Sequence, residues 1–204
     1  MTISMYDILC ITNRRLCKED FLKRIRRIAE NHPKAIVLRE KDLTPDEYRS
    51  LAEQVMSICN KYGTVCILHS FADIAAELGA EGIHLPLHIL RELDDVTKRK
   101  FRIIGASCHS AEDAMEAEKL GASYITAGHV FATDCKKGLP PRGIEFLRNV
   151  CNNVDIPVFA IGGMSPENIG EVCEAGAAGA CVMSGLMSCI DPAGTLSLYK
   201  GELK

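Results

Sequence analysis

The chain contains no tryptophan, no basic tract and no C-x-x-C pair, and each absence excludes a class of protein. Only 5% of its 204 residues are aromatic, and charges of both signs are mixed along the chain to a net charge of -3. Nucleic-acid binding needs basic grooves or stacking platforms, so the sequence predicts no nucleic-acid partner. No stretch reaches the ~18 apolar residues of a membrane span, and the first residues do not resemble a signal peptide. We therefore expect a cytoplasmic protein with no membrane partner.

Ten cysteines are many for this length, but their arrangement argues against disulfide bonds and zinc. The usual zinc spacing is missing, and without a signal peptide the thiols should stay reduced. Cys10, Cys66 and Cys181 fall inside apolar strand patterns, where cysteine acts as a small buried hydrophobic residue. Cys108 and Cys135 instead fall near predicted functional loops, which leaves a reactive thiol open as an alternative.

What the sequence does contain is an alternation of short apolar runs with segments of helical periodicity. Strands are predicted at 8–11, 35–38, 64–68, 82–85, 102–105, 124–128, 156–161 and 180–183. The helices between them begin at capping sequences, such as Thr44 to Glu47, and several end at a glycine. Such repeats favour parallel βαβ connections, and eight of them close a barrel. We predict an α/β protein whose residues 1–204 form one domain, a single (β/α)8 TIM barrel; a doubly wound open sheet is the alternative.

Polar or small residues follow the predicted strands at the points where the strands end. In a closed barrel these residues share one mouth, and the loops after the seventh and eighth strands commonly hold a phosphate group. The residues at the strand ends are Arg39 to Lys41, His69 and Ser70, His84 to His88, Ser107 to His109, His129, Gly162 and Gly163, and Met183 to Gly185. The glycines also have a simpler interpretation, as residues required by tight turns alone.

Two of these groups carry chemistry of their own. His129 directly follows a buried strand, and a histidine titrates near neutral pH, although an ordinary loop histidine is the alternative. Arg39 and Lys41 are two positions apart on a strand, so both point to one side and Glu40 to the other. Together they could clamp a carboxylate or phosphate, while a solvated charge cluster is the plainer interpretation.

Six stretches of the chain match one known family. They are VLREKDL at 37–43, EGIHLP at 81–86, GASCHS at 105–110, AGHVFATDCKKG at 127–138, AIGGM at 160–164 and CVMSG at 181–185. Through them the chain resembles the thiamine phosphate synthase and TenI family over nearly its whole length. The resemblance implies a barrel that handles a thiazole phosphate in thiamine biosynthesis.

Departures from the family pattern favour one of its two branches. The synthases carry an Asn-Asp pair after the third strand and an acidic residue after the fourth, which hold magnesium; this chain has His69-Ser70 and 87–89 there. Magnesium requires hard oxygen ligands, so we expect no metal and no cofactor. The synthases also read Gly-Pro-Val-Phe where this chain has Gly128-His129-Val130-Phe131. That form resembles the TenI branch, which implies an isomerase, a thiazole tautomerase.

The resemblance to that branch assigns a role to each candidate residue. His129 would be the catalytic acid and base that moves a proton on a carboxythiazole phosphate substrate and so makes its ring aromatic. The expected substrate-binding residues are Gly162, Gly163, Met183 and Ser184 with Lys136 for the phosphate, Arg39 and Lys41 for the carboxylate, and Ser107 and His109 for the ring. A magnesium-dependent transferase, thiamine phosphate synthase, stays open as an alternative, as does a non-catalytic regulatory protein that binds thiazole or thiamine phosphate. A homo-oligomer is open as well, because family members often associate.

Overall fold

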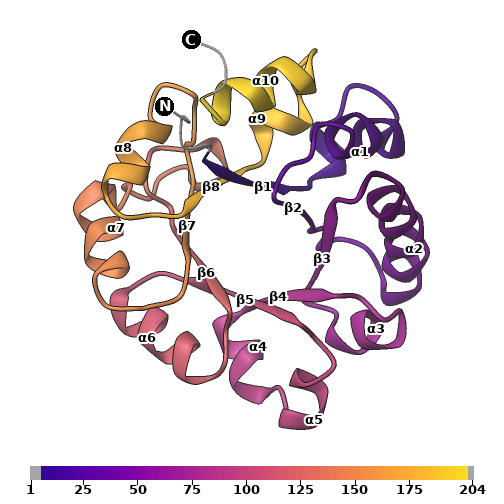
Figure 1. The fold of residues 1–204 in the computed structure, drawn as a ribbon, viewed down its shortest axis with the longest axis horizontal. Coiled ribbons are helices and arrows are strands. Elements are labelled where there is room, and N and C mark those ends of the chain that lie inside the picture. Colours follow the sequence, from indigo (N-terminus) through magenta and orange to yellow (C-terminus); the bar gives the residue numbers. More distant parts are fainter. Residues whose placement is uncertain (1–5, 202–204) are drawn as a thin grey trace.

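Eight parallel strands form a closed ring in the computed structural model, which describes residues 6–201 apart from the side chain of Cys135 (Figure 1). Neighbouring strands pair in chain order, and β1 pairs with β8 to complete the barrel. The strands are β1 (Asp7–Ile11), β2 (Ala35–Leu38), β3 (Val65–His69), β4 (Gly82–Pro86), β5 (Ile103–Cys108), β6 (Tyr124–Gly128), β7 (Val158–Ile161) and β8 (Gly179–Val182). The predicted (β/α)8 barrel is therefore confirmed, and the open-sheet alternative is wrong.

Helices surround this ring on its outside (Figure 1). Those within the described residues are α1 (Phe21–Ala29), α2 (Pro45–Tyr62), α3 (Ala72–Glu77), α4 (Leu87–Glu92), α5 (Asp95–Lys98), α6 (Ala111–Lys119), α7 (Gly143–Cys151), α8 (Ile169–Glu174), α9 (Ser184–Met187) and α10 (Pro192–Tyr199). Two 3-10 turns, η1 (Arg14–Leu16) and η2 (Asp134–Lys136), lie in the loops after β1 and β6. None of the helices found between residues 6 and 201 has the length and apolar character needed to cross a membrane.

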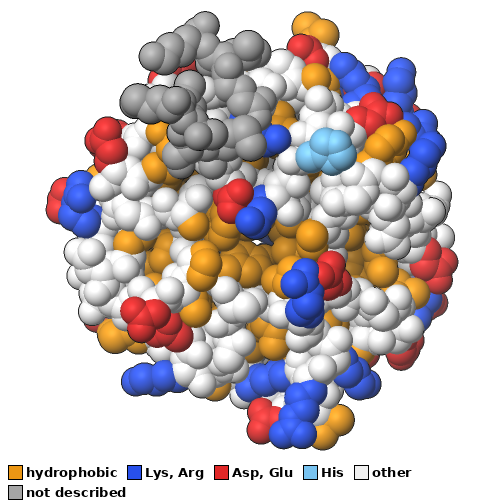
Figure 2. Space-filling view, viewed as in Figure 1, with side chains coloured by type: hydrophobic (Ala, Val, Ile, Leu, Met, Phe, Trp, Pro, Cys, Tyr) orange, Lys and Arg blue, Asp and Glu red, His pale blue; other side chains and the backbone are white. Residues whose placement is uncertain are grey.

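Strand pleating divides the hydrophobic core into two parts. On β1, Leu9 and Ile11 belong to a cluster inside the barrel, whereas Ile8 and Cys10 belong to the larger cluster that includes the helices. Cys10, Cys66 and Cys181 are all buried, as predicted for cysteines in apolar strands. The face of the molecule seen in Figure 2 has hydrophobic side chains around the centre of the ring and most charged groups toward its edge.

The segment at 89–98 forms two helices. Leu93 is extended at the end of α4, and Asp94 then caps α5, because its carboxylate accepts hydrogen bonds from the backbone N–H groups of Val96 and Thr97. The aspartate thus starts a new helix where α4 ends.

Helix boundaries near the chain's end also differ from the prediction. The sequence at 165–168 resembles a helix start, but α8 begins only at Ile169, because Asn168 Oδ1 accepts the N–H of Ser165 and keeps the preceding residues in a turn. Neither α9 nor α10 was predicted, although Asp191 followed by Pro192 caps α10 in the usual way. In the segment at 199–204, which gave no packing signal, Tyr199 is buried, and residues 202–204 lie outside the described part of the chain.

Candidate active site

A cavity of about 500 Å³ opens at the carboxyl ends of the strands. This volume is within the range of small-molecule sites. All ten residues that the sequence analysis selected line it: Arg39, Lys41, Ser107, His109, His129, Lys136, Gly162, Gly163, Met183 and Ser184. The barrel thus brings residues from β2, β5, β6, β7 and β8 and their loops into one mouth.

Three cationic side chains line the mouth. Arg39 and Lys41 follow β2, Lys136 lies in the loop after β6, and we call these three residues the cationic lip. No Asp or Glu in residues 6–201 lies within ion-pair distance of them. Although Lys41 is exposed overall, partial loss of water around its ammonium group lowers its pKa, and the neighbouring charges of Arg39 and Lys136 add to this effect. Because these cations repel one another, a bound anion would reduce the repulsion.

Glu40 is buried and does not line the mouth, and its carboxylate is already occupied; because β2 ends at Leu38, residues 39–41 follow the strand instead of lying on it as predicted. It accepts hydrogen bonds from Thr12 Oγ1 at 2.7 Å and from the guanidinium of Arg14 at 3.1 Å. The Thr12 hydroxyl in turn accepts the N–H of Arg39 at 2.9 Å. This buried network fixes the backbone at the exit of β2 and thereby holds the cationic lip in place.

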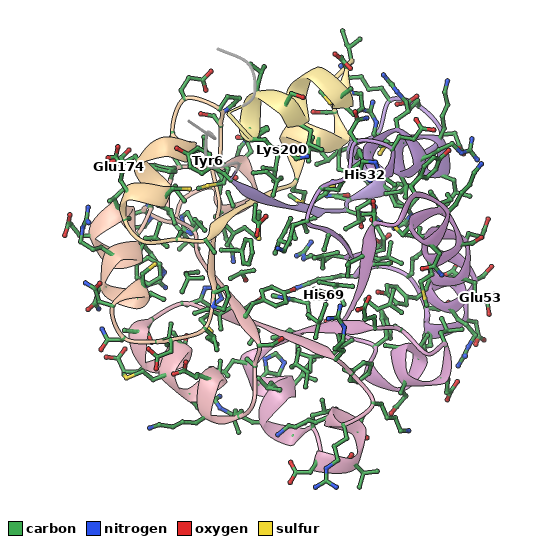
Figure 3. The ribbon with its side chains drawn as sticks, in the orientation of Figure 1. Tyr6, His32, Glu53, His69, Glu174 and Lys200 are labelled. Atoms are coloured by element: carbon green, nitrogen blue, oxygen red, sulfur yellow. The ribbon has the colours of Figure 1, made fainter. Side chains whose placement is uncertain are left out.

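The described part of the mouth contains no acidic side chain. At the positions where the family resemblance implied magnesium ligands, His69 is buried beside Ser70 Oγ (2.7 Å from Nδ1), and Leu87 is buried and apolar. Burial, with the nearby His84, Arg39 and Lys41, lowers the pKa of His69 to about 2, so its imidazole is neutral. Figure 3 shows this ring pointing from β3 into the barrel.

These residues do not fit a magnesium ion, because it prefers carboxylate oxygens and none faces the mouth. Across the described residues, no three His, Cys, Asp or Glu side chains are grouped in a way that could hold a metal ion.

Another part of the mouth is built from backbone. We call Gly162, Gly163, Met183 and Ser184, which follow β7 and β8, the glycine lip. Gly162 and Gly163 have φ angles of +99° and +68°, and a Cβ atom at either would overlap the loop after β6. The turn interpretation of these glycines is thus correct as far as it goes. Because these glycines carry no side chain, a ligand in the cavity can also approach their backbone.

His129 follows β6, lines the cavity and lies against Gly162 of the glycine lip. Its Nε2 is 3.4 Å from the carbonyl oxygen of Leu139 in the same loop, a long contact. The preceding residue, Gly128, accepts a hydrogen bond from His109 Nδ1 at 2.9 Å, which fixes the orientation of the His109 ring. The structure therefore places His129 in the mouth, where the sequence predicted it.

The sequence analysis missed a polar group inside the barrel. His84 on β4 contacts the hydroxyl of Tyr124 on β6 and that of Ser107 on β5, each at 2.9 Å. The signal was available, because His84 interrupts an apolar strand whose neighbours on both sides, Ile83 and Leu85, are fully buried. A histidine at such a position must face either the helices or the barrel interior.

A reactive thiol is wrong for Cys108. The residue is fully buried on β5, and this burial raises the pKa of its thiol to about 12, far from the low pKa of reactive cysteines. The side chain of Cys135, the other candidate, lies outside the described residues.

Comparisons with known proteins agree on one family. A family model described as "Thiamine monophosphate synthase" matches residues 8–186. The chain is 37% identical over 186 residues to a thiamine-phosphate synthase of Pyrococcus horikoshii, which covers 89% of this chain and 86% of the relative. It is 35% identical over 189 residues to a thiamine-phosphate synthase of Clostridium acetobutylicum, covering 90% and 88%. A solved thiamine phosphate pyrophosphorylase from Pyrococcus furiosus superimposes with a TM-score of 0.83 at 30% identity, over 97% of this chain and 95% of that one.

These findings confirm an enzyme of thiamine biosynthesis and overturn the expected reaction. The prediction of a thiazole tautomerase rested on His129 and on the missing carboxylates, and it is wrong, since relatives similar over most of their length are synthases. The physical error was to treat absent metal ligands as evidence about the bond that is made. Their absence bears on how negative charge is neutralised. By sequence and by fold, this chain belongs to the thiamine phosphate synthase and TenI family.

Proposed function

We propose that this barrel is a transferase, a thiamine phosphate synthase that joins a pyrimidine diphosphate to a thiazole phosphate and releases diphosphate. One observation carries the proposal: a single cavity is lined by two groups of residues suited to anions, one of side-chain cations and one of backbone. Two phosphorylated substrates need two such places, and the names of the relatives point to the same reaction.

The two substrates differ in charge, and this difference assigns them to the lips. The diphosphate carries more charge, so the cationic lip of Arg39, Lys41 and Lys136 suits it. The single phosphate of the thiazole suits the glycine lip, where backbone N–H groups are within reach of a small anion. Ser107 and His109 then lie beside the rings that must meet.

In the joining step the thiazole nitrogen forms a bond to the methylene carbon of the pyrimidine. The bond from that carbon to the diphosphate oxygen breaks, and the diphosphate leaves with the electron pair. No proton moves to or from carbon, so the reaction has no need of the acid and base that we expected His129 to supply. We assign to His129 a contact role beside the glycine lip.

The charge that develops on the leaving diphosphate must be stabilised without the aligned carboxylates that would hold magnesium. Arg39, Lys41 and Lys136 are the cations available for it in the mouth. Fixed positive groups aimed at developing negative charge are an effective form of catalysis. In the proposed reaction these cations, and no metal ion held by the protein, stabilise the leaving diphosphate.

The test is to incubate the purified protein with both substrates and to follow thiamine phosphate and diphosphate together by mass spectrometry. Equal amounts of the two products are expected, and neither should form when one substrate is omitted. If both substrates bind but no product forms, with or without added magnesium, the transferase is excluded and a non-catalytic binding protein is the better description.

A further inference from the structure

Three side chains from neighbouring strands form a hydrogen-bonded line that runs from the barrel interior to the mouth. Tyr124 and His84 are 6% and 4% exposed, whereas Ser107 lines the cavity. The Tyr124 hydroxyl is 2.9 Å from His84 Nδ1, and Ser107 Oγ is 2.9 Å from His84 Nε2. Only the last member of this line is within reach of a substrate.

The hydrogen bonds of this line have only one possible donor-to-acceptor direction. The Tyr124 hydroxyl is buried, and His84 Nδ1 is its hydrogen-bond partner, so the phenol donates there. Burial, together with Arg39 and Lys41, lowers the pKa of His84 to about 3, so the ring is neutral and carries one proton. With Nδ1 accepting, that proton is on Nε2 and is donated to Ser107 Oγ. The reverse arrangement would leave a buried phenol without an acceptor.

Packing fixes the imidazole in this position. The His69 ring stacks on one side at 5.6 Å between centroids, and Phe159 meets the Tyr124 ring edge-on at 5.7 Å. Gly105 lies beneath both polar rings, and a Cβ atom there would overlap Tyr124 and His84. Only glycine leaves space at position 105 for the line, so the arrangement depends on the sequence at four positions.

We propose that Tyr124 and His84 are positioning residues that fix the Ser107 hydroxyl as a hydrogen-bond donor to an unprotonated acceptor atom of a bound substrate. The acceptor is either an oxygen of the diphosphate or an atom of the thiazole phosphate. Because the oxygen of Ser107 already accepts the Nε2–H of His84, its own proton is free to point into the mouth. This proposal rests on the transferase proposed above, which supplies the substrates.

The tautomer of His84 can be measured without any activity. In ¹⁵N-labelled protein the ring should carry its proton on Nε2, with Nδ1 unprotonated, and this state should persist across the neutral pH range. Tyr124→Phe removes only the hydroxyl and should release the tautomer to a mixture. A wild-type ring protonated on Nδ1 would overturn the proposal whether or not the protein is a transferase.

Kinetics test the function of the line. Tyr124→Phe and Ser107→Ala should each lower kcat/KM by about tenfold, the effect of losing one hydrogen bond to the substrate, and the double variant should be no worse than Ser107→Ala. His84→Gln, whose amide N–H can still donate to Ser107, should retain more activity than His84→Leu. Tyr62→Phe, on the outer helix α2, is the matched control and should leave the rate unchanged. Additive losses, or wild-type kinetics for Tyr124→Phe, would contradict the proposal.

Calorimetry identifies the acceptor. Inorganic diphosphate and thiazole phosphate are titrated separately into the wild type and Ser107→Ala. The ligand that binds about tenfold more weakly to the variant holds the acceptor atom. Unchanged affinity for both would show that Ser107 donates to neither, whereas a protein that binds both but has no transferase activity would refute only the proposed function.

Discussion

The two lips of the mouth offer the same ligand chemistry by different means. The cationic lip presents full charges on long side chains, and its residues have no described carboxylate partners. The glycine lip presents backbone, held close to the loop after β6 by hydrogen bonds from Val130 and Phe131 to the carbonyls of Ile161 and Gly162 at 2.9 and 3.1 Å. One lip therefore depends on charge and the other on shape.

This difference predicts how each lip responds to change. Charge acts over a distance and is weakened by salt or by removal of the cation. Shape is lost when a single atom is added, because the backbone there has no room to move. Substitutions of equal size should thus affect substrate binding at the first lip and both binding and stability at the second.

The largest effect is expected from removing charge at the cationic lip. Arg39→Met with Lys41→Met should lower kcat/KM by about a thousandfold, because two fixed cations are lost from the developing charge of the leaving group. The melting temperature should not fall, because the repulsion between these cations is removed. Lys100→Met, an exposed cation outside the mouth, is the control. A loss as small as that of the control would remove the cationic lip from the reaction.

At the glycine lip, Gly162→Ala should reduce both stability and thiazole phosphate binding. Its added methyl group would overlap His129, at a φ angle of +99° that alanine rarely adopts. We expect about 3 kcal/mol lower stability in urea unfolding, from strain and overpacking together. Gly79→Ala, at φ +65° with open space around it, isolates the backbone strain and should cost about 1 kcal/mol. Equal losses in the two variants would show that the glycine lip is not crowded.

The structure places the residues of both lips at the mouth, where the sequence predicted them, and their roles stay predictions. Strand alternation was the wrong reason for Arg39 and Lys41, because β2 ends at Leu38; they reach the mouth, as the glycines do, because parallel strands end at one edge. What could not be predicted was pairing across strands. The contact of Thr12 with Glu40 joins residues 28 apart, and that of His84 with Tyr124 joins residues 40 apart. Such contacts depend on barrel register, which apolar periodicity does not specify.

The reaction itself was predicted wrongly for a related reason. His129 was given the leading role because a titratable residue at a strand end is conspicuous in a sequence. Which bond is made depends on how two substrates meet across the whole mouth. Similarity along nearly all of the chain carries that information, and a single substituted position does not.

A smaller effect is expected from pH at the cationic lip. The pKa of Lys41 is lowered in the free protein by loss of water and by its cationic neighbours, and a bound anion should raise it again. Diphosphate binding should therefore take up protons at alkaline pH, and its affinity should fall by a few-fold as pH rises between the two pKa values. Calorimetry in buffers of different ionisation enthalpy measures this uptake. The Lys41→Arg variant stays charged and should lack the uptake due to Lys41. Any uptake that remains in this variant comes from titration of the anion itself.

Beside the glycine lip, His129→Asn should lower turnover by only a few-fold. A residue that transfers no proton contributes a contact, and one contact accounts for about a factor of ten at most. The pH profile of kcat should keep its shape in the variant. A loss of a hundredfold or more, with a changed pH profile, would restore the histidine to the chemistry and require a different account of the joining step.

The smallest effect is expected from removing divalent cations, and it tests the comparison most directly. If the cationic lip alone neutralises the diphosphate, excess chelator should change kcat by no more than about twofold, because no carboxylate in the described mouth could hold magnesium against it. His69→Asp would place a carboxylate in the mouth at the end of β3, and this variant should gain a response to magnesium that the wild type lacks. Activity that vanishes in chelator and returns with magnesium would leave the transferase intact. It would show that the diphosphate binds together with the magnesium ion and that the cationic lip supplies only part of the positive charge that neutralises it.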